Sequence, residues 1–341
     1  MEKFKQSKNH KNTLVISLGD PAGIGTEIVL KALGSKHINQ NIQPILVGCK
    51  NNIYETYSKL INRKINNIPA PTELNIIDIP LENDIIPGKV NKHSGEASFK
   101  WLYHATMLVI KGEANALVTA PISKIAWHKA GHKYAGQTEL LGELTNKKTS
   151  MLFTAISPNN GWRLNTLLAT THIPLDSINK NLTKELIRHK LDSLLKFCLN
   201  FKEKPLIQVS GLNPHAGEEG KIGIDEQNLI IPTLNEWKLD NPSVEIHGPV
   251  PPDTCWISSA DAWNSPLSKN NAPDGILALY HDQGLIPVKL IAFDQAVNTT
   301  LGLPFVRTSP DHGTALDIAG QFKAREASMI AAMNNAWILS Q

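Results

Sequence analysis

The chain has 341 residues, which is enough for two domains, or one large one, and for a core that needs no disulfide bonds. Its 41% hydrophobic and 19% charged residues are typical of a globular protein and exclude a disordered one. The 34 basic and 31 acidic residues leave a formal charge of +3, which is too small and too evenly spread to indicate a nucleic-acid partner.

The cysteines and the apolar runs indicate where the protein works. Three cysteines, Cys49, Cys198 and Cys255, occur without C-x-x-C spacing, which favours a reducing compartment and excludes a cysteine-rich zinc site. The apolar run at 14–18 is too short for a signal-peptide core, and no run approaches the roughly 20 apolar residues of a membrane helix. We therefore expect a cytoplasmic protein with no membrane partner and a flexible tail at residues 1–12.

Apolar runs alternate with helical patterns along the chain. The patterns predict strands at 13–18, 45–48 and 116–119, helices at 26–33 and 94–110, and loops over much of 66–90. Further along they predict an amphipathic helix at 184–201 with Thr183 as its N-cap, and strands at 206–210, 276–280 and 287–291. This alternation is typical of an α/β fold with a largely parallel sheet.

Polar residues directly follow four of the apolar runs. The segments are VTAP (118–121), LLATTH (167–172), VSGLNPH (209–215) and ILALYHD (276–282). Because ligands bind beyond the carboxyl ends of the strands in open α/β sheets, His172, His215 and His281 can converge there. Three neutral imidazoles suit a divalent metal and leave a coordination position for a substrate, whose alkoxide the cation would stabilise. The alternative is three ordinary hydrogen-bonded histidines, and spacing alone does not separate the two.

Two glycine-rich segments give weaker signals. The segment GDPAGIG (19–25) matches neither G-x-G-x-x-G nor G-x-x-x-x-G-K-[ST], which excludes the Rossmann and P-loop fingerprints. The segment GEEGKIG (217–223) could form a mobile lid or a surface turn, and its pattern alone favours the turn.

The C-terminal part holds candidate nucleotide and phosphate contacts. In DHGTALDIAG (311–320) the glycines allow close approach of a nucleotide, and an Asp carboxylate can accept a hydrogen bond from a ribose hydroxyl. The alternative interpretation is a loop that enters a helix, with Thr314 as the N-cap. Lys289, Asn298 and Arg307 follow His281, and a lysine charge and an arginine fork suit a phosphate or carboxylate. Taken singly, each would be a solvated surface residue.

Eight segments in order resemble one known family. They are GDPAGIGTEI, TAPISK, GQTELL, TTHIPL, SGLNPHAGEEGKIGIDE, GPVPPDT, YHDQGLIPVK and VNTTLGLPFVRTSPDHGTALDIAG. Together they closely resemble the 4-hydroxythreonine-4-phosphate dehydrogenases of vitamin B6 biosynthesis, over essentially the whole chain after residue 12. The resemblance implies the two-lobed α/β fold of isocitrate and isopropylmalate dehydrogenases, with the active site in the interdomain cleft. The implied lobes are 13–138 with 296–341, on the cofactor side, and 139–295, on the metal and dimer side.

The resemblance also assigns site residues. It implies a homodimer in which His172, His215 and His281 bind one divalent ion (zinc, magnesium or cobalt), with the third ligand supplied across the subunit interface. The implied substrate-binding residues are Gln137, Thr138, Lys289, Asn298 and Arg307. The likeness of the 312–319 stretch to an adenosine-binding loop points to NAD or NADP at His312, Gly313, Thr314 and Asp317.

One position departs from the family pattern. Many members carry histidine where this chain has Gln137, and glutamine can hydrogen-bond but cannot titrate near neutral pH. A general base at this position is therefore not expected. Water at the metal, Asp282 and Lys124 stay open as proton acceptors.

The implied reaction is the NAD(P)-dependent oxidation of 4-phosphooxy-L-threonine to 2-amino-3-oxo-4-phosphooxybutanoate. That β-keto acid would lose CO2 to give 3-amino-2-oxopropyl phosphate, on the way to pyridoxine 5'-phosphate. A paralogous dehydrogenase of 4-phospho-threonate or 4-phospho-erythronate is the main alternative. A metal-dependent phosphohydrolase usually needs an Asp-rich two-metal site, which the chain lacks, and a non-catalytic module is disfavoured by the complete histidine set.

Overall fold

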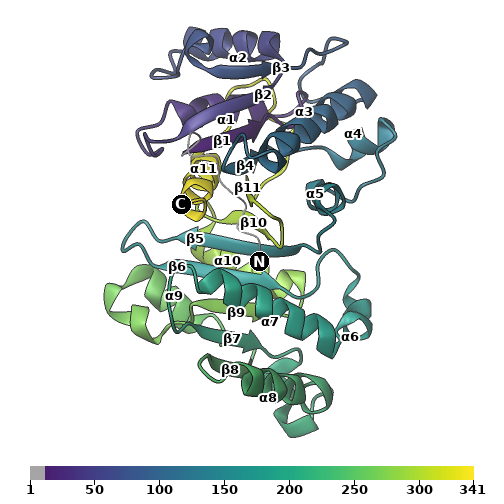
Figure 1. The fold of residues 1–341 in the computed structure, drawn as a ribbon, viewed down its shortest axis with the longest axis vertical. Coiled ribbons are helices and arrows are strands. Elements are labelled where there is room, and N and C mark those ends of the chain that lie inside the picture. Colours follow the sequence, from purple (N-terminus) through teal and green to yellow (C-terminus); the bar gives the residue numbers. More distant parts are fainter. Residues whose placement is uncertain (1–11) are drawn as a thin grey trace. The chain divides into compact units, whose positions relative to one another are not determined.

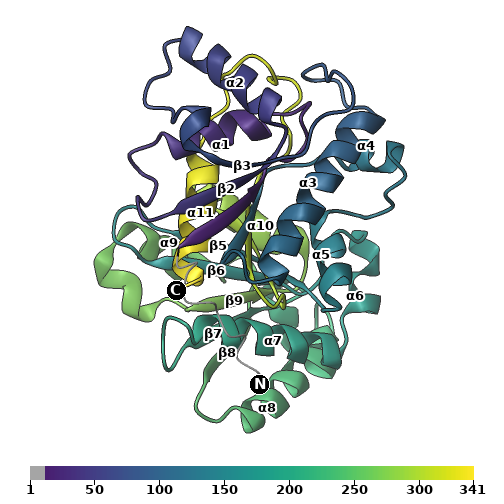
Figure 2. The ribbon, with the colours of Figure 1, turned by 45° about the horizontal axis from the view of Figure 1, so that its top comes forward.

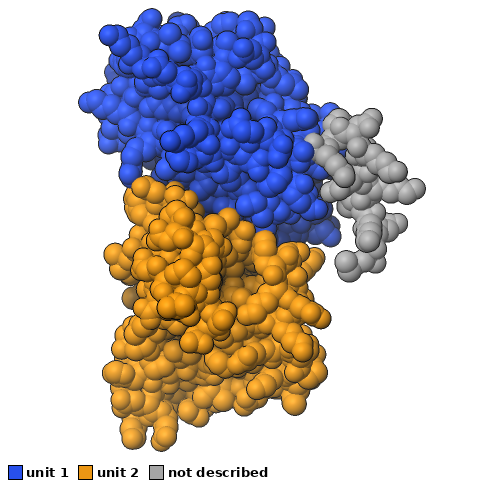
Figure 3. Space-filling view, turned by 90° about the vertical axis from the view of Figure 1, so that its left-hand side faces the viewer, with its two compact units in different colours: residues 1–149, 297–341 blue, residues 150–296 orange. Residues whose placement is uncertain are grey.

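The computed structural model describes residues 12–341, so all of the predicted flexible tail except residue 12 lies outside the described residues. The chain divides into two compact units (Figure 3). The first contains the residues up to 149 together with 297–341, and the second contains residues 150–296. In the part of the chain that the structure describes, no helix is both long and apolar enough to cross a membrane.

The first unit alternates strands and helices. Its strands are β1 (Thr13–Ser17), β2 (Gln43–Gly48), β3 (Asn75–Asp78), β4 (Ala116–Thr119), β10 (Val297–Leu301) and β11 (Val306–Pro310). Its helices are α1 (Gly25–Leu33), α2 (Lys50–Asn62), α3 (Lys92–Ile110), α4 (Lys124–Lys129), α5 (Gln137–Thr145) and α11 (Ala327–Leu339). The strand order is β3-β2-β1-β4-β11-β10, and only β10 runs antiparallel to its neighbour β11.

Helices cover both faces of this sheet. Figures 1 and 2 show α3 with α4 on one side of the strands and α1 with α11 on the other. Every residue of β1 and β4 is buried, because a parallel strand enclosed on both faces needs a continuous apolar run. Asn91 starts α3 by accepting hydrogen bonds from the backbone N–H groups of His93 and Ser94, both at 2.9 Å.

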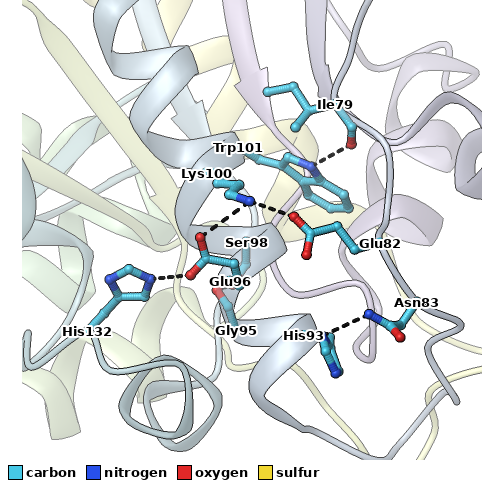
Figure 4. A network of polar contacts seen from close by, with 10 residues as sticks. All are labelled: Ile79, Glu82, Asn83, His93, Gly95, Glu96, Ser98, Lys100, Trp101 and His132. Carbon is cyan, nitrogen blue, oxygen red and sulfur yellow. Dashed lines mark hydrogen bonds and ion pairs between the residues drawn. The ribbon is translucent and has the colours of Figure 1, made fainter.

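A polar network ties α3 to the segment that leads into α5 (Figure 4). Glu96 of α3 binds His132, with 2.7 Å between Oε2 and Nε2, and also receives Lys100 at 3.5 Å. The His132 ring stacks on Phe99, with 3.6 Å between the ring centroids. These contacts hold residue 132, which lies shortly before Gln137, against α3.

The second unit is also α/β. Its strands are β5 (Ser150–Ile156), β6 (Arg163–Leu168), β7 (Leu206–Ser210), β8 (Glu245–Val250) and β9 (Gly275–Ala278). Its α-helices are α6 (Ile178–Asn181), α7 (Lys184–Cys198), α8 (Ile231–Asp240), α9 (Ile257–Asn264) and α10 (His281–Ala292). The strand order is β5-β6-β9-β7-β8, and all neighbours are parallel except β5 and β6. The predicted α/β class with a largely parallel sheet is confirmed.

Most predicted elements are present, and one is wrong. The predicted strand at 287–291 lies inside helix α10. Its buried residues Leu285, Val288 and Ala292 recur at helical spacing, and their burial outweighs the helix-breaking tendency of Pro287. The predicted loop region 66–90 contains β3 and the short 3-10 helix Pro71–Glu73. Within the described residues 315–326 no helix begins, so Thr314 is not an N-cap; α11 starts at Ala327.

The predicted N-cap of α7 is confirmed, and its contribution to the stability of the protein can be measured. The Thr183 side chain accepts a hydrogen bond from the backbone N–H of Leu186 at 3.1 Å. Thr183→Ala is expected to lower the free energy of unfolding by about 1 kcal/mol, because one N–H of the first turn loses its partner. Urea denaturation measures this. Ser177→Ala is the matched control: Ser177 precedes α6 without a side-chain capping bond, so a similar loss there would contradict the capping explanation.

Candidate active site

A polar face runs across β4, β11 and β10 in the first unit. Arg307 of β11 pairs with Leu117 of the parallel strand β4. In the antiparallel pair of β10 and β11, Asn298 lies opposite Ser309 and Thr299 lies opposite Thr308. Because side chains alternate between the two faces of a sheet, Arg307 shares its face with Thr119, Asn298 and Thr300.

Arg307 is a buried cation whose hydrogen-bond partners are neutral. Its side chain is 3% exposed. The Thr119 hydroxyl accepts from Nε at 3.2 Å and from Nη2 at 2.6 Å, the Thr300 hydroxyl accepts from Nη1 at 3.0 Å, and Gln137 Oε1 accepts from Nη2 at 3.3 Å. Burial lowers the pKa of Arg307 to about 10, while the charge of Glu139 acts to raise it. A buried cation without a bound counter-ion is costly, so this face is suited to an anionic ligand.

Asn298 adds an acceptor with no partner of its own. Among the residues that the structure describes, its Oδ1 is one of three buried side-chain atoms without a hydrogen bond. Buried acceptors of this kind call for an explanation, and a ligand that donates an N–H or O–H provides one. The structure thus brings Asn298 and Arg307, both predicted from sequence, to one face with Thr119 of the predicted strand-end segment 118–121, and adds Thr300, which sequence reasoning missed.

The start of α5 adjoins Arg307. Gln137, its first residue, donates from Nε2 to the backbone oxygen of Ala120 at 3.1 Å and accepts from Arg307. A side-chain carbon placed on Gly136 would lie 3.6 Å from Lys124 Cε, so the Lys124 side chain reaches the same helix start. Thr138, the other predicted substrate residue here, is half-buried.

Two of the three predicted metal-binding histidines lie together in the second unit. His172 follows β6 and His281 follows the neighbouring strand β9, and their ring centroids are 5.5 Å apart. His281 Nδ1 lies 2.7 Å from Asp282 Oδ1, which leaves Nε2 as the nitrogen available for a metal. His172 has φ 46°, a left-handed conformation that a non-glycine residue adopts at a cost and that is concentrated at functional sites.

His215 is not gathered with the other two. Among residues 12–341 no group of three His, Cys, Asp or Glu side chains is close enough to hold a metal ion. His215 lies in the 3-10 segment Pro214–Gly220, where five consecutive residues have positive φ between 42° and 80°. The donor types suit a divalent metal, and within one chain His172 and His281 are the two of the three histidines that lie near each other.

A buried carboxylate that sequence reasoning missed holds the His215 segment. Glu226 is fully buried, and its Oε1 accepts from the backbone N–H groups of Leu212 at 2.7 Å and Asn213 at 2.8 Å. Its Oε2 accepts from Asn213 Nδ2 at 2.8 Å. A side-chain carbon on Gly217 would lie 2.8 Å from the same Oε2, so the glycine lets the turn close over the carboxylate. The first part of the segment 217–223 is therefore a turn that packs on the Glu226 carboxylate.

Glu226→Gln tests this arrangement. The amide keeps one accepting oxygen but places an NH2 group against Asn213 Nδ2, so two donors face each other in a buried site. We expect the free energy of unfolding to fall by about 1–3 kcal/mol, as for hydrogen bonds to a charged group. Glu219→Gln, an exposed change in the same turn, is the control in a urea titration. Equal stability of the two variants would contradict the role given to Glu226.

The predicted cofactor residues lie in a loop between β11 and α11. The Thr314 backbone oxygen accepts from the backbone N–H of Ile24 at 3.1 Å, and a side-chain carbon on Gly23 would lie 2.8 Å from that oxygen. The loop that holds His312, Gly313 and Asp317 thus packs on the turn that precedes α1. In that turn Asp20 accepts from the N–H of Ala22 at 2.9 Å, and burial raises the pKa of its carboxyl group.

Lys289 lies on α10, not on a strand, and is half-buried. Its Nζ is 5.8 Å from the centroid of the Phe293 ring. It belongs to the same unit and the same helix as His281, whereas Asn298 and Arg307 belong to the first unit.

Known proteins resemble this chain over nearly its whole length. A 4-hydroxythreonine-4-phosphate dehydrogenase of Synechococcus sp. is 53% identical over 324 residues, covering 95% of this chain and 98% of the relative. A D-threonate 4-phosphate dehydrogenase of Pectobacterium atrosepticum is 37% identical, covering 96% of this chain and 99% of the relative. The crystal structure of 4-hydroxythreonine-4-phosphate dehydrogenase from Klebsiella pneumoniae matches with a TM-score of 0.79 and 33% identity, over 98% of this chain and all of that one.

The α/β units and these relatives define an enzyme. The family model described as pyridoxal phosphate biosynthetic protein PdxA matches residues 35–336. The chain belongs to this family, and the predicted membership is confirmed.

Proposed function

We propose that the chain oxidises 4-phosphooxy-L-threonine with NAD or NADP, as one step of pyridoxine 5'-phosphate biosynthesis. The observation that carries the proposal is Arg307, a buried guanidinium whose hydrogen-bond partners are neutral and which shares a face with the unpartnered Asn298 oxygen. A phosphate supplies the missing negative charge, and a polar substrate supplies donors for Asn298. The names of the relatives in Synechococcus and Klebsiella support this substrate class.

The remaining roles follow from the same proposal. Arg307 and Lys289 hold the phosphate, and Thr138 and Asn298 hold the polar part of the substrate. His172, His215 and His281 would hold a divalent ion (zinc, magnesium or cobalt), which supplies a Lewis acid for the substrate hydroxyl. Asp282 is engaged by His281, so we assign it an orienting role and assign proton transfer to Lys124, which reaches the start of α5. The loop with His312, Gly313, Thr314 and Asp317 binds the nicotinamide cofactor's adenosine.

The carbon chemistry completes the reaction. Removal of hydride from the hydroxyl-bearing carbon and of the hydroxyl proton gives 2-amino-3-oxo-4-phosphooxybutanoate. Its carbonyl is β to the carboxylate, so the carboxylate leaves as CO2, the electron pair of the broken C–C bond passes to an enol, and a proton from water takes its place on the carbon, which gives 3-amino-2-oxopropyl phosphate.

The proposal includes a cytoplasmic homodimer whose metal site is completed across the subunit interface. Ile286 and Leu290 of helix α10 form an apolar stripe with Phe293, the residue that directly follows the helix; the three side chains are 60%, 82% and 62% exposed. A stripe of this kind on a helix marks a surface for another protein. Since α10 begins at His281, a partner seated on the stripe would lie close to that ligand. The proposed lobes remain 13–138 with 296–341, and 139–295.

A D-threonate 4-phosphate substrate is the second candidate, favoured by the relative of that name in Pectobacterium. The two substrates share the phosphate and differ in an amino or a hydroxyl group. The deciding experiment is NADH formation by the purified chain with 4-phosphooxy-L-threonine and with 4-phospho-D-threonate, each with and without a chelator. Faster, chelator-sensitive turnover of the amino acid supports the proposal. Phosphate release without NADH would instead indicate a phosphohydrolase.

A further inference from the structure

Gln137 makes two hydrogen bonds that fix the orientation of its amide. The Ala120 backbone oxygen can only accept, so it must face Nε2, at 3.1 Å. The Arg307 guanidinium can only donate, so it must face Oε1, at 3.3 Å from Nη2. The reversed amide would lose both bonds. Both polar ends of Gln137 are thus used inside the protein.

The remaining contacts of Arg307 have the same character. Thr119 and Thr300 accept from the guanidinium through hydroxyl oxygens. Hydroxyl and amide oxygens orient a cation without cancelling its charge, whereas a carboxylate in the same place would pair with it. The acidic group that acts on Arg307 through its charge, Glu139, is exposed.

We infer that Gln137 is a positioning residue, which holds the Arg307 guanidinium as a neutral acceptor and so keeps its full charge for the phosphate of the substrate. This deepens the proposed function, because it rests on Arg307 as the phosphate-binding group. It also gives Gln137 a role through Arg307, in place of the direct substrate contact expected from the sequence.

Two variants that place an ionisable group beside Arg307 test the inference. In Gln137→His, a neutral imidazole can donate to Ala120 and accept from Arg307, but the imidazolium only donates and carries a like charge. Relative to wild type, KM for the phosphorylated substrate should be unchanged at pH 8 and should rise toward acid pH, up to roughly tenfold where the imidazole is protonated. The like charge of Arg307 lowers the imidazole pKa below its ordinary value of about 6.5, so the rise begins below that pH. In Gln137→Glu, the carboxylate neutralises Arg307, so KM should be raised at pH 8 and should stay raised down to pH 5.5, because pairing with Arg307 lowers the pKa of the carboxylate below its ordinary value of about 4.3.

Thr300→Val is the matched control. It removes another neutral acceptor from Arg307 and introduces no titrating group, so its KM ratio to wild type should be raised by the same factor at every pH. Arg307 stays protonated throughout, because its pKa of about 10 lies above the range used. Thermal denaturation of each variant checks that it is folded, and kcat, measured together with KM, shows whether the change is confined to binding.

The direct-contact alternative predicts the opposite sign. If Gln137 touched the phosphate itself, the imidazolium of Gln137→His would bind it more tightly, and the KM ratio would fall on acidification. That outcome, or a KM of Gln137→Glu equal to that of wild type at pH 8, overturns the inference.

Calorimetric binding of inorganic phosphate gives a readout that needs no turnover. Phosphate affinity should be lowered in Gln137→Glu at pH 8, and lowered in Gln137→His only where its imidazole is protonated, even if the wild-type chain fails to oxidise 4-phosphooxy-L-threonine. In that case the proposed substrate is wrong and the role of Gln137 stands. Absence of phosphate binding by the wild-type chain would overturn the inference itself.

Discussion

Arg307→Ala is expected to lower kcat/KM for the phosphorylated substrate by between roughly 30-fold and several thousand-fold, which corresponds to roughly 2–5 kcal/mol for loss of a buried charged partner. The substrate phosphate would enter a buried site that no longer holds a cation. Arg307→Lys keeps the charge but loses the fork that Thr119 and Thr300 orient, so a smaller loss of roughly 1–3 kcal/mol is expected. Steady-state kinetics with the phosphorylated substrate measure both.

Two controls separate phosphate binding from folding. The loss should be much smaller on 4-hydroxythreonine, which lacks the phosphate. Arg163→Ala is the matched variant, because Arg163 is a half-buried arginine whose pKa is also lowered by burial to about 10, and it packs on Phe201 in the second unit. It should reduce stability without a phosphate-specific effect. Equal losses on both substrates for Arg307→Ala would show that Arg307 does not hold the phosphate.

His172→Ala, His215→Ala and His281→Ala are each expected to abolish metal-dependent turnover while the chain stays folded. Each imidazole would supply one of three protein ligands, and two remaining ligands hold an ion weakly. The measurements are turnover with added metal, the metal content of the purified variant, and a denaturation curve. Stoichiometric metal together with near-normal kcat in all three variants would rule out the site.

Mixing the inactive variants tests whether the site is shared between subunits. If His281 acts across the interface, a heterodimer of His172→Ala and His281→Ala contains one intact site. With random exchange about half of the dimers are mixed, so roughly a quarter of wild-type activity should return. His172→Ala mixed with His215→Ala should stay inactive. The competing model is a site built within one chain, where the His172 and His281 ring centroids are 5.5 Å apart. It predicts that no mixture recovers activity, although mass spectrometry shows that the subunits have exchanged.

Local sequence patterns were sufficient to predict a secondary-structure element where a residue's neighbours along the chain determine its environment. The buried strands β1 and β4 follow from apolar runs, and the start of α7 follows from Thr183. The prediction of a strand at 287–291 was wrong, because a short apolar run that contains a proline is compatible with either a strand or a helix. Burial of Leu285, Val288 and Ala292 on one face of α10 decided it.

The α/β class, the family and the residue types at the candidate site could be predicted from the amino-acid sequence, because these depend on composition, alternation and ordered motifs. Which side chains meet could be learned only from the folded chain. Thr119, Gln137 and Thr300 converge on Arg307 from β4, α5 and β10, and Glu226 reaches back to the backbone that carries His215. The contacts of Thr119 and Gln137 with Arg307 join segments distant along the chain, and the others depend on how neighbouring strands and turns pack. A local pattern holds no information about strand order or register, which are fixed by packing of the whole unit.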